Sequence, residues 1–147
     1  MHGFDNIIRG IGLILIAKNT GRIYTIRELE AKPIIRKEEG MISFPLETIE
    51  MDETCHETIK RLVDEEITGY SHENITNLSI SPVFLMVVPG VHAHIAWGFC
   101  ESEFLVKPQD NDVAYYGWCP IPELLSKESF VRVETRPLLG VYLSENK

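Results

Sequence analysis

The chain has 147 residues, of which 44% are hydrophobic and 24% charged, a composition typical of a globular protein with its own core. Its formal net charge of -8 argues against general nucleic-acid binding, because contacts to a phosphate backbone need clustered Lys and Arg. That charge still permits a small phosphorylated ligand held through a divalent metal. Three cysteines, Cys55, Cys100 and Cys119, do not suggest a disulfide framework, so we expect free thiols and a cytoplasmic location.

Nothing in the chain resembles a leader peptide or a membrane anchor. The first residues lack a basic start followed by a long apolar stretch. The apolar runs at 11–17 and 83–88 are too short to span a bilayer. We expect a single domain over residues 1–147 without membrane attachment, and the sequence leaves the oligomeric state open, with a homodimer as one option.

The first third of the chain predicts a hairpin followed by a loop. Residues 7–17 are apolar and β-branched, which predicts a buried strand. An Asn-Thr-Gly turn separates them from residues 22–29, which alternate like a second strand. Residues 30–40 predict a charged loop with at most a short strand. Residues 41–50 predict extended structure, with Pro45 at a strand end or edge.

The strongest helix prediction begins after Thr54. Residues 54–57, Thr-Cys-His-Glu, match a capping box, in which the Thr54 hydroxyl accepts from the N–H three residues on and Glu57 reaches back. Gly69 is a plausible end of this helix. Apolar residues recur at helical spacing between these limits: Cys55, Ile59, Leu62, Val63 and Ile67.

The remainder of the chain predicts more strands and a closing helix. The segments are a strand ending at residue 88, a Pro-Gly turn, a return strand over 91–104, a polar loop over 107–113, a strand and helical turn over 114–125, and a helix over 136–145. This order of elements predicts an α+β sandwich.

The acidic segment at 43–69 resembles the signature of the Nudix hydrolase family, G-x5-E-x7-R-E-U-x-E-E-x-G-U, where U is aliphatic. Counted from Glu53, seven residues lead to Arg61. Val63 then stands at the first aliphatic position, and Glu65 and Glu66 stand at the paired acidic positions.

The resemblance extends beyond this signature. Phe44-Pro45 matches the dipeptide that commonly precedes the signature, and residues 117–125 resemble the family's tryptophan-containing strand followed by a helical turn. The order of elements agrees over nearly the whole chain. The resemblance therefore implies a Nudix-type α/β/α sandwich around a mixed β-sheet.

The signature is degenerate at four positions. Glu47 replaces the opening glycine, Leu62 the glutamate after arginine, Thr68 the later glycine and Gly69 the last aliphatic residue. In the family the glutamate after arginine contributes a carboxylate near the metal. We expect the helix face at Leu62 to meet solvent or metal, because the Glu65-Glu66 pair is preserved, so that Leu62→Glu would strengthen metal binding. The alternative is that Leu62 packs in the core.

The resemblance implies a site for Mg²⁺ or Mn²⁺, which prefer oxygen ligands. It makes Glu65, Glu66 and Arg61 the catalytic residues and Glu65, Glu66 and Glu53 the metal ligands. Without a glutamate at position 62, Arg61 is expected to pair with Glu53. The fold often supplies one more carboxylate from a later strand or loop, for which the sequence offers Glu101, Glu103, Asp110 and Asp112.

For the substrate we expect contacts from Trp97, His94 and Asp112. His92 and His94 share one face of a strand, and zinc binding there would need a third ligand that the spacing does not provide. Aromatic residues near these strands are either core residues or stacking partners for a nucleobase: Trp97, Tyr115, Tyr116 and Trp118.

The resemblance implies metal-dependent hydrolysis of a nucleoside diphosphate linked to another moiety, X, with weakened activity. Two alternatives stay open. One is a Nudix-fold module that has lost catalysis and still binds a nucleotide or a partner, which the residues at 47, 62 and 68 favour. The other is an acidic interaction domain without a nucleotide site.

Overall fold

The computed structural model describes residues 7–106 and 112–147, which form one mixed β-sheet between helices. The strands are β1 (Ile8–Ala17), β2 (Ile23–Glu28), β3 (Ile42–Ser43), β4 (Leu46–Thr48), β5 (Thr76–Leu85), β6 (Val91–Cys100) and β7 (Val113–Cys119). Along the sheet the order is β3-β2-β1-β6-β5, with β4 beside β1 and β7 beside β2. The strands β1 and β6 run parallel over their full lengths, and the other pairs are antiparallel.

The sheet divides along one edge of β1. Over residues 10–12 β1 pairs with β4, whereas its far end pairs with β2 at Ile16 and Ile23. The strands β2 and β7 continue away from this point as a second branch. This division opens a space between β1 and β4 on one side and the β2–β7 pair on the other.

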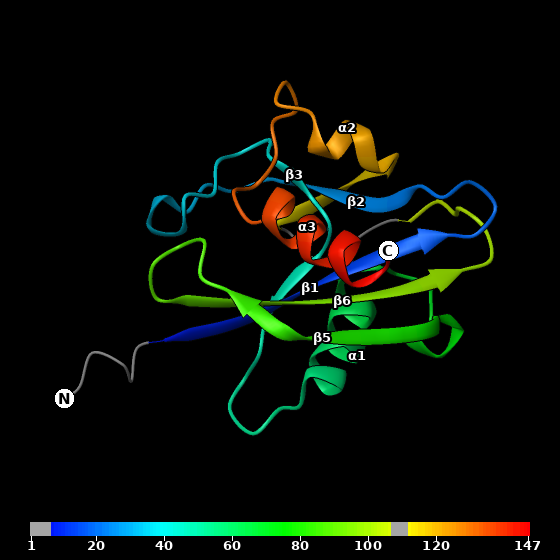
Figure 1. The fold of residues 1–147 in the computed structure, drawn as a ribbon, viewed down its shortest axis with the longest axis horizontal. Helices are drawn as coiled ribbons and strands as arrows, with labels where there is room; N and C mark the ends of the chain where they lie inside the picture. The colour runs from blue at the N-terminus through cyan, green and yellow to red at the C-terminus, as the bar shows by residue number, and fades with distance from the viewer. Residues whose placement is uncertain (1–6, 107–111) are drawn as a thin grey trace.

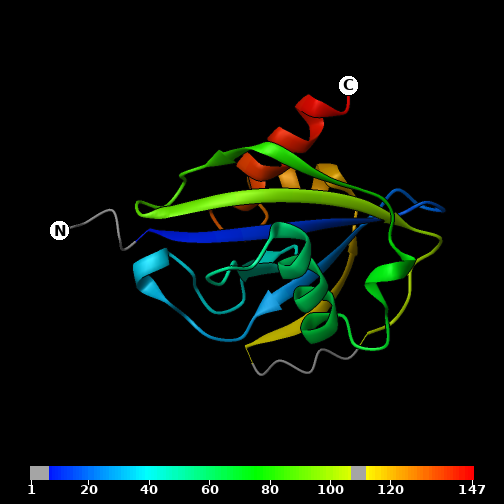
Figure 2. The ribbon, with the colours of Figure 1, turned by 90° about the horizontal axis from the view of Figure 1, so that it is seen from below.

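Helices cover both faces of the sheet. The helix α1 (Cys55–Glu66) lies on one face, and α3 (Thr135–Glu145) lies on the other, with the short α2 (Ile121–Leu125) beside it (Figures 1 and 2). Two 3-10 turns, η2 (Pro33–Ile35) and η3 (His72–Asn74), lie in the connections. The predicted α/β/α sandwich is confirmed.

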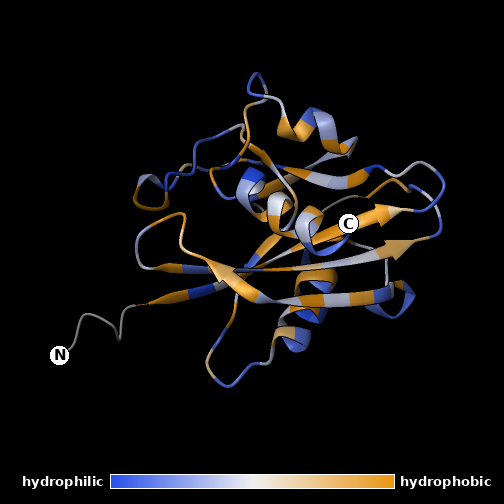
Figure 3. Cartoon of the chain, in the orientation of Figure 1, coloured by the Kyte–Doolittle hydropathy of each residue, from blue (hydrophilic) through white to orange (hydrophobic). Residues whose placement is uncertain are grey.

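Each helical layer encloses its own core. Ile59, Leu62 and Val63 of α1 pack against one side of β1, and Leu138 and Leu139 of α3 pack against the other side. Figure 3 shows the reason in the sequence: β1 is hydrophobic on both sides over its second half, whereas α1 alternates between hydrophobic and hydrophilic residues. A strand covered on both faces needs continuous apolar sequence, and a surface helix needs only one apolar stripe.

Most local predictions hold. The hairpin of β1 and β2 forms, and the capping box is present, with Glu57 N–H donating to Thr54 Oγ1 at 3.1 Å and Thr54 N–H donating to Glu57 Oε1 at 2.8 Å. The helix α1 ends at Glu66, before Gly69, whose φ of 85° is left-handed. Residues 30–40 contain the 3-10 turn η2 in place of a strand. Within the described ranges, no helix is long and apolar enough to cross a membrane.

The expectation that Leu62 faces solvent or metal is wrong. Its side chain is fully buried among Ile59, Val63 and the β1 residues of the core. One helical turn separates Leu62 from Glu66, so both project toward the sheet. Leu62 lies over closed core, whereas Glu66 reaches the space where the sheet divides. A carboxylate at position 62 would therefore lack both solvent and a cation.

Candidate functional site

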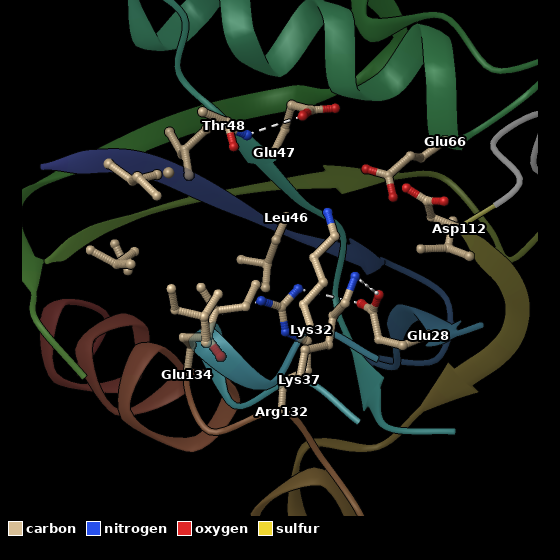
Figure 4. A pocket seen from close by; sticks show the side chains of 18 residues that line it. Glu28, Lys32, Lys37, Leu46, Glu47, Thr48, Glu66, Asp112, Arg132 and Glu134 are labelled. Atoms are coloured by element: carbon tan, nitrogen blue, oxygen red, sulfur yellow. Dashed lines mark hydrogen bonds and ion pairs between the residues drawn. The ribbon is translucent and has the colours of Figure 1, made fainter. Parts of the chain in front are cut away.

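A cavity of about 360 Å³ occupies the division of the sheet (Figure 4). Its walls come from β1, β4, the end of β2, the start of β7, the last turn of α1, the η2 segment and the residues before α3. Because α1 and α3 lie on opposite faces of the sheet, the cavity collects side chains from both layers. This is the concave, partly apolar and partly charged type of space in which small ligands bind.

Carboxylates gather at the α1 end of the cavity. Glu66 projects into it from the last turn of α1, Glu47 from β4, and Asp112 from the residue before β7 (Figure 4). Glu66 is 3% exposed although its side chain is acidic. Tyr24 fixes the C-terminal end of α1, since the Tyr24 hydroxyl donates to the Glu66 backbone carbonyl at 3.2 Å. The fold thus brings Glu66 and Asp112, both predicted site residues, to one cavity.

Glu47 and Glu65 meet beside this end. Burial raises the pKa of Glu47, a hydrogen bond from the Thr48 N–H at 3.0 Å opposes the rise, and a hydrogen bond between the Glu47 and Glu65 carboxyl groups adds to it. Glu65 itself is half exposed and faces outward. Arg61 lies 3.4 Å from Glu47 and 3.9 Å from Glu65, so its single positive charge is shared between these two acids.

Arg61 also holds α1 to the chain that precedes it. Its Nε and Nη2 each donate to Glu53 at 3.0 Å, and Nη2 donates to the Thr48 carbonyl at 2.6 Å. Glu53 accepts in addition from the Glu50 N–H and the Thr58 hydroxyl. The expected Arg61–Glu53 pair is present. The oxygens of Glu53 are engaged in these contacts, which differs from the metal-ligand role that the resemblance implies.

Buried charges form the opposite end of the cavity. Glu28 lies 3.2 Å from Lys37 and 3.4 Å from Arg132, and Arg132 donates to Glu134 at 2.9 Å. All four residues are at most 9% exposed. Lys32 also lines the cavity, and its side chain extends from this end toward Leu46 (Figure 4). A buried ion network costs desolvation energy, and well-packed apolar residues of similar volume are often as stable.

The other predicted substrate contacts lie elsewhere. Trp97 packs on the α3 side of the sheet, edge-on to Tyr142 with ring centroids 5.5 Å apart. His92 stacks on Phe84 of β5 with ring centroids 4.3 Å apart, and His94 lies tilted against the same ring with centroids 5.5 Å apart. Neither Trp97 nor His94 lines the cavity. Trp118 donates its indole N–H to the Phe104 carbonyl and belongs to the core on the α1 side.

The four candidates for a further metal-binding carboxylate also differ in whether they reach the cavity. Glu101 pairs with Lys18, and Glu103 with Arg22 and Thr20, so both fix the β1–β2 turn away from the cavity. Asp112 reaches the cavity, and Asp110 lies outside the described residues. Of the candidate loop acids that are described, Asp112 alone is placed at the site.

The acidic end fits a divalent cation in the chemistry of its donors. Carboxylate oxygens suit Mg²⁺ and Mn²⁺, and Mg²⁺ is commonly held by one or two carboxylates together with water and substrate phosphate. Within residues 7–106 and 112–147, no group of three or more His, Cys, Asp or Glu residues could hold a metal ion. A metal at this end would need further ligands, such as water or phosphate oxygens.

Sequence reasoning did not find the residues of the basic end or the place of Glu47. Glu28, Lys37, Arg132 and Glu134 are far apart in the chain and carry no motif. In the sequence, Glu47 stands out only because it replaces the opening glycine of the signature. An extra carboxylate at that position, in a signature that lacks the glutamate at position 62, could have pointed to Glu47 as a site residue.

The fold resembles that of several solved structures. The MutT protein from Methanosarcina mazei is 20% identical, with 95% of each chain covered and a TM-score of 0.68. A Nudix hydrolase from Nitrosomonas europaea is 16% identical, with 95% of this chain and 88% of that one covered and a TM-score of 0.62.

A third structure contains a ligand and a metal. It is a bifunctional NMN adenylyltransferase/ADP-ribose pyrophosphatase from Francisella tularensis, solved as a complex with AMP and a Mn ion. It is 14% identical, the match covers 96% of this chain and 42% of that one, and the TM-score is 0.68. No protein-family model matches the sequence, and no curated protein matches it.

Proposed function

Since the chain has the fold of the Nudix hydrolases, we propose that it hydrolyses the diphosphate linkage between a nucleoside and a further moiety, X, with a divalent metal. The observation that carries this proposal is the buried carboxylate of Glu66, which α1 delivers into a cavity shared with Glu47 and Asp112. A small phosphorylated ligand is the partner that such a cavity suits.

In this proposal Glu66, with Glu65 at the rim, holds Mg²⁺ or Mn²⁺, and the ligand's phosphate oxygens complete the coordination. The metal would supply neutralisation of the charge that develops on phosphate. Asp112, which lies beside Glu66 at the same end of the cavity (Figure 4), contacts the ligand or its metal. Trp97, His94 and Glu53 are left out of the site, because the first two do not line the cavity and the third is held by Arg61.

Glu47 is the proposed base that takes a proton from the attacking water. It lines the cavity, and burial raises its pKa, which brings a carboxylate closer to the pKa that suits a general base at neutral pH. Arg61 is a positioning residue, since it holds β4, Glu47 and the start of α1 together through the Thr48 carbonyl and Glu53.

One observation favours a second function, a binding module without turnover. A fully buried leucine, Leu62, stands where the Nudix signature has a glutamate after the arginine, so this chain lacks that carboxylate. In that case the cavity would bind the same phosphorylated ligand, and Glu47 would only balance Arg61.

A screen separates these functions. Diphosphate compounds are tested with Mg²⁺ and with Mn²⁺ for product formation and for a shift in melting temperature. Metal-dependent product formation supports the hydrolase. Stabilisation without product supports the binding module. Neither effect with any compound supports an acidic interaction domain.

A further inference from the structure

The basic end of the cavity has more hydrogen-bond donors than its own carboxylates use. An ammonium group carries three N–H donors and a guanidinium five. Lys37 is paired with Glu28, and Arg132 with Glu28 and Glu134. Within the part of the chain that the structure describes, Arg132 Nε has no hydrogen-bond partner. Both cations therefore keep donors that these carboxylates do not engage.

Lys32 adds a positive charge that no side chain among residues 7–106 and 112–147 balances. Its side chain projects into the cavity (Figure 4), and it forms no ion pair with any described residue. Its backbone is fixed to that of Lys37, because Lys32 N–H donates to the Lys37 carbonyl at 2.8 Å and Lys37 N–H donates to the Lys32 carbonyl at 3.1 Å. The buried network itself is balanced, with two cations, Lys37 and Arg132, against two carboxylates, Glu28 and Glu134, so Lys32 supplies the excess positive charge beside it.

The walls between the two ends are aliphatic. They are lined by Ile8, Ile11, Ile35, Leu46 and Val113. Among the described residues, no aromatic side chain lines the cavity. Nucleobases are usually held by stacking on aromatic rings. The group at the basic end is therefore recognised by charge and not by stacking.

We propose that X, the moiety joined to the diphosphate, carries a second phosphate or a carboxylate, and that Lys32, Lys37 and Arg132 bind this anionic group. The inference rests on the proposed function for the place of the diphosphate, at the end with Glu66 and Glu47. Lys37 and Arg132 are buried, and charge pairs are stronger in a water-poor environment than at the surface. Arg and Lys with fixed partners are suited to phosphate and carboxylate oxygens.

The test compares two ligands by calorimetric titration in the presence of Mn²⁺: pyrophosphate, which offers the diphosphate alone, and 5-phosphoribosyl 1-diphosphate, which adds a sugar and a distant phosphate. The variant is Lys32→Met, because this exposed side chain makes no ion pair with any residue that the structure describes, and its backbone contacts survive the change. The control is Lys127→Met, which removes the same charge from an exposed site that does not line the cavity.

We expect the wild type to bind 5-phosphoribosyl 1-diphosphate more tightly than pyrophosphate, and Lys32→Met to lose about tenfold to a hundredfold of affinity for the former only. Lys127→Met should behave as the wild type. The inference is overturned if the wild type shows no preference, if Lys32→Met keeps it, or if both variants lose it equally.

Hydrolysis is scored separately, so that the two proposals fail independently. A preserved, Lys32-dependent preference without product formation contradicts the hydrolase and supports the anion site. Metal-dependent hydrolysis of diphosphates without any preference for the second anionic group supports the hydrolase and contradicts the anion site.

Discussion

Arg61 and Glu53 form a two-point ion pair between α1 and the loop before it, with Nε and Nη2 both 3.0 Å from the carboxylate oxygens. Such pairs fix geometry as well as charge, because a planar guanidinium matches a planar carboxylate. The same guanidinium reaches the Thr48 carbonyl, so the pair also fixes β4 and thereby Glu47. The shape of the acidic end depends on this arginine.

Arg61→Ala should lower the free energy of unfolding by about 1–3 kcal/mol, because it leaves Glu53 and the Thr48 carbonyl without a charged donor. Urea unfolding at neutral pH measures the loss. Lys60→Ala is the control, since it removes a neighbouring charge from the exposed side of α1. Equal stability of Arg61→Ala and the wild type would contradict the bracing role.

The Arg61 pair also predicts a dependence on pH. Hydrogen bonds from Arg61, the Glu50 N–H and Thr58 lower the pKa of Glu53 from 4.5 to about 2. A carboxyl whose pKa is lower in the folded state stabilises the fold above its unfolded pKa, and that contribution disappears as pH falls through the folded pKa. The difference in the free energy of unfolding between the wild type and Glu53→Gln should therefore be constant near neutral pH. It should shrink as the pH falls from 4.5 to about 2. A difference that does not change over this interval would contradict the pairing.

The order of elements, the capping box and the amphipathic α1 were predictable because each depends on residues close together in the sequence. The role of Leu62 was not, because the helical spacing places it on one face with Glu66 but does not say where the core ends and the cavity begins. That boundary is set by the division of the sheet between β4 and β2. Likewise Glu28, Lys37, Arg132 and Glu134 meet only through the tertiary fold, and Trp97 lies on a face that the strand pattern left undetermined.

Leu62→Glu should destabilise the protein by several kcal/mol, since it buries a carboxylate without a partner. Leu62→Met keeps the volume and polarity and should cost less than about 1.5 kcal/mol. Melting temperatures of the two variants, with and without Mn²⁺, measure the contrast. A stable Leu62→Glu protein with stronger metal binding would show that this face opens to the site.

Glu47→Gln should raise the melting temperature at neutral pH without metal. Burial raises the pKa of Glu47, so the folded protein resists its ionisation and loses stability as pH rises above the ordinary value of 4.5. The same variant should slow any hydrolysis by about 10²–10⁴-fold, as expected for loss of a base. Glu50→Gln is the control, because Glu50 lies 3.7 Å from the same Arg61 but is largely exposed. Equal melting temperatures and equal hydrolysis rates in Glu47→Gln and Glu50→Gln would contradict the proposed role of Glu47.

The most direct test of the proposed hydrolase is the Mn²⁺-dependent cleavage of ADP-ribose and UDP-glucuronate, two nucleoside diphosphates joined to a sugar, by the wild type, Glu66→Gln and Asp64→Asn. Asp64→Asn is the control, because it removes an acid from the exposed side of the same helix and Asp64 does not line the cavity. We predict metal-dependent product formation from at least one compound, a loss of about 10²–10³-fold in Glu66→Gln, and wild-type rates in Asp64→Asn. Equal rates in Glu66→Gln and the wild type, or no cleavage of either compound by any of the three proteins, would contradict the account.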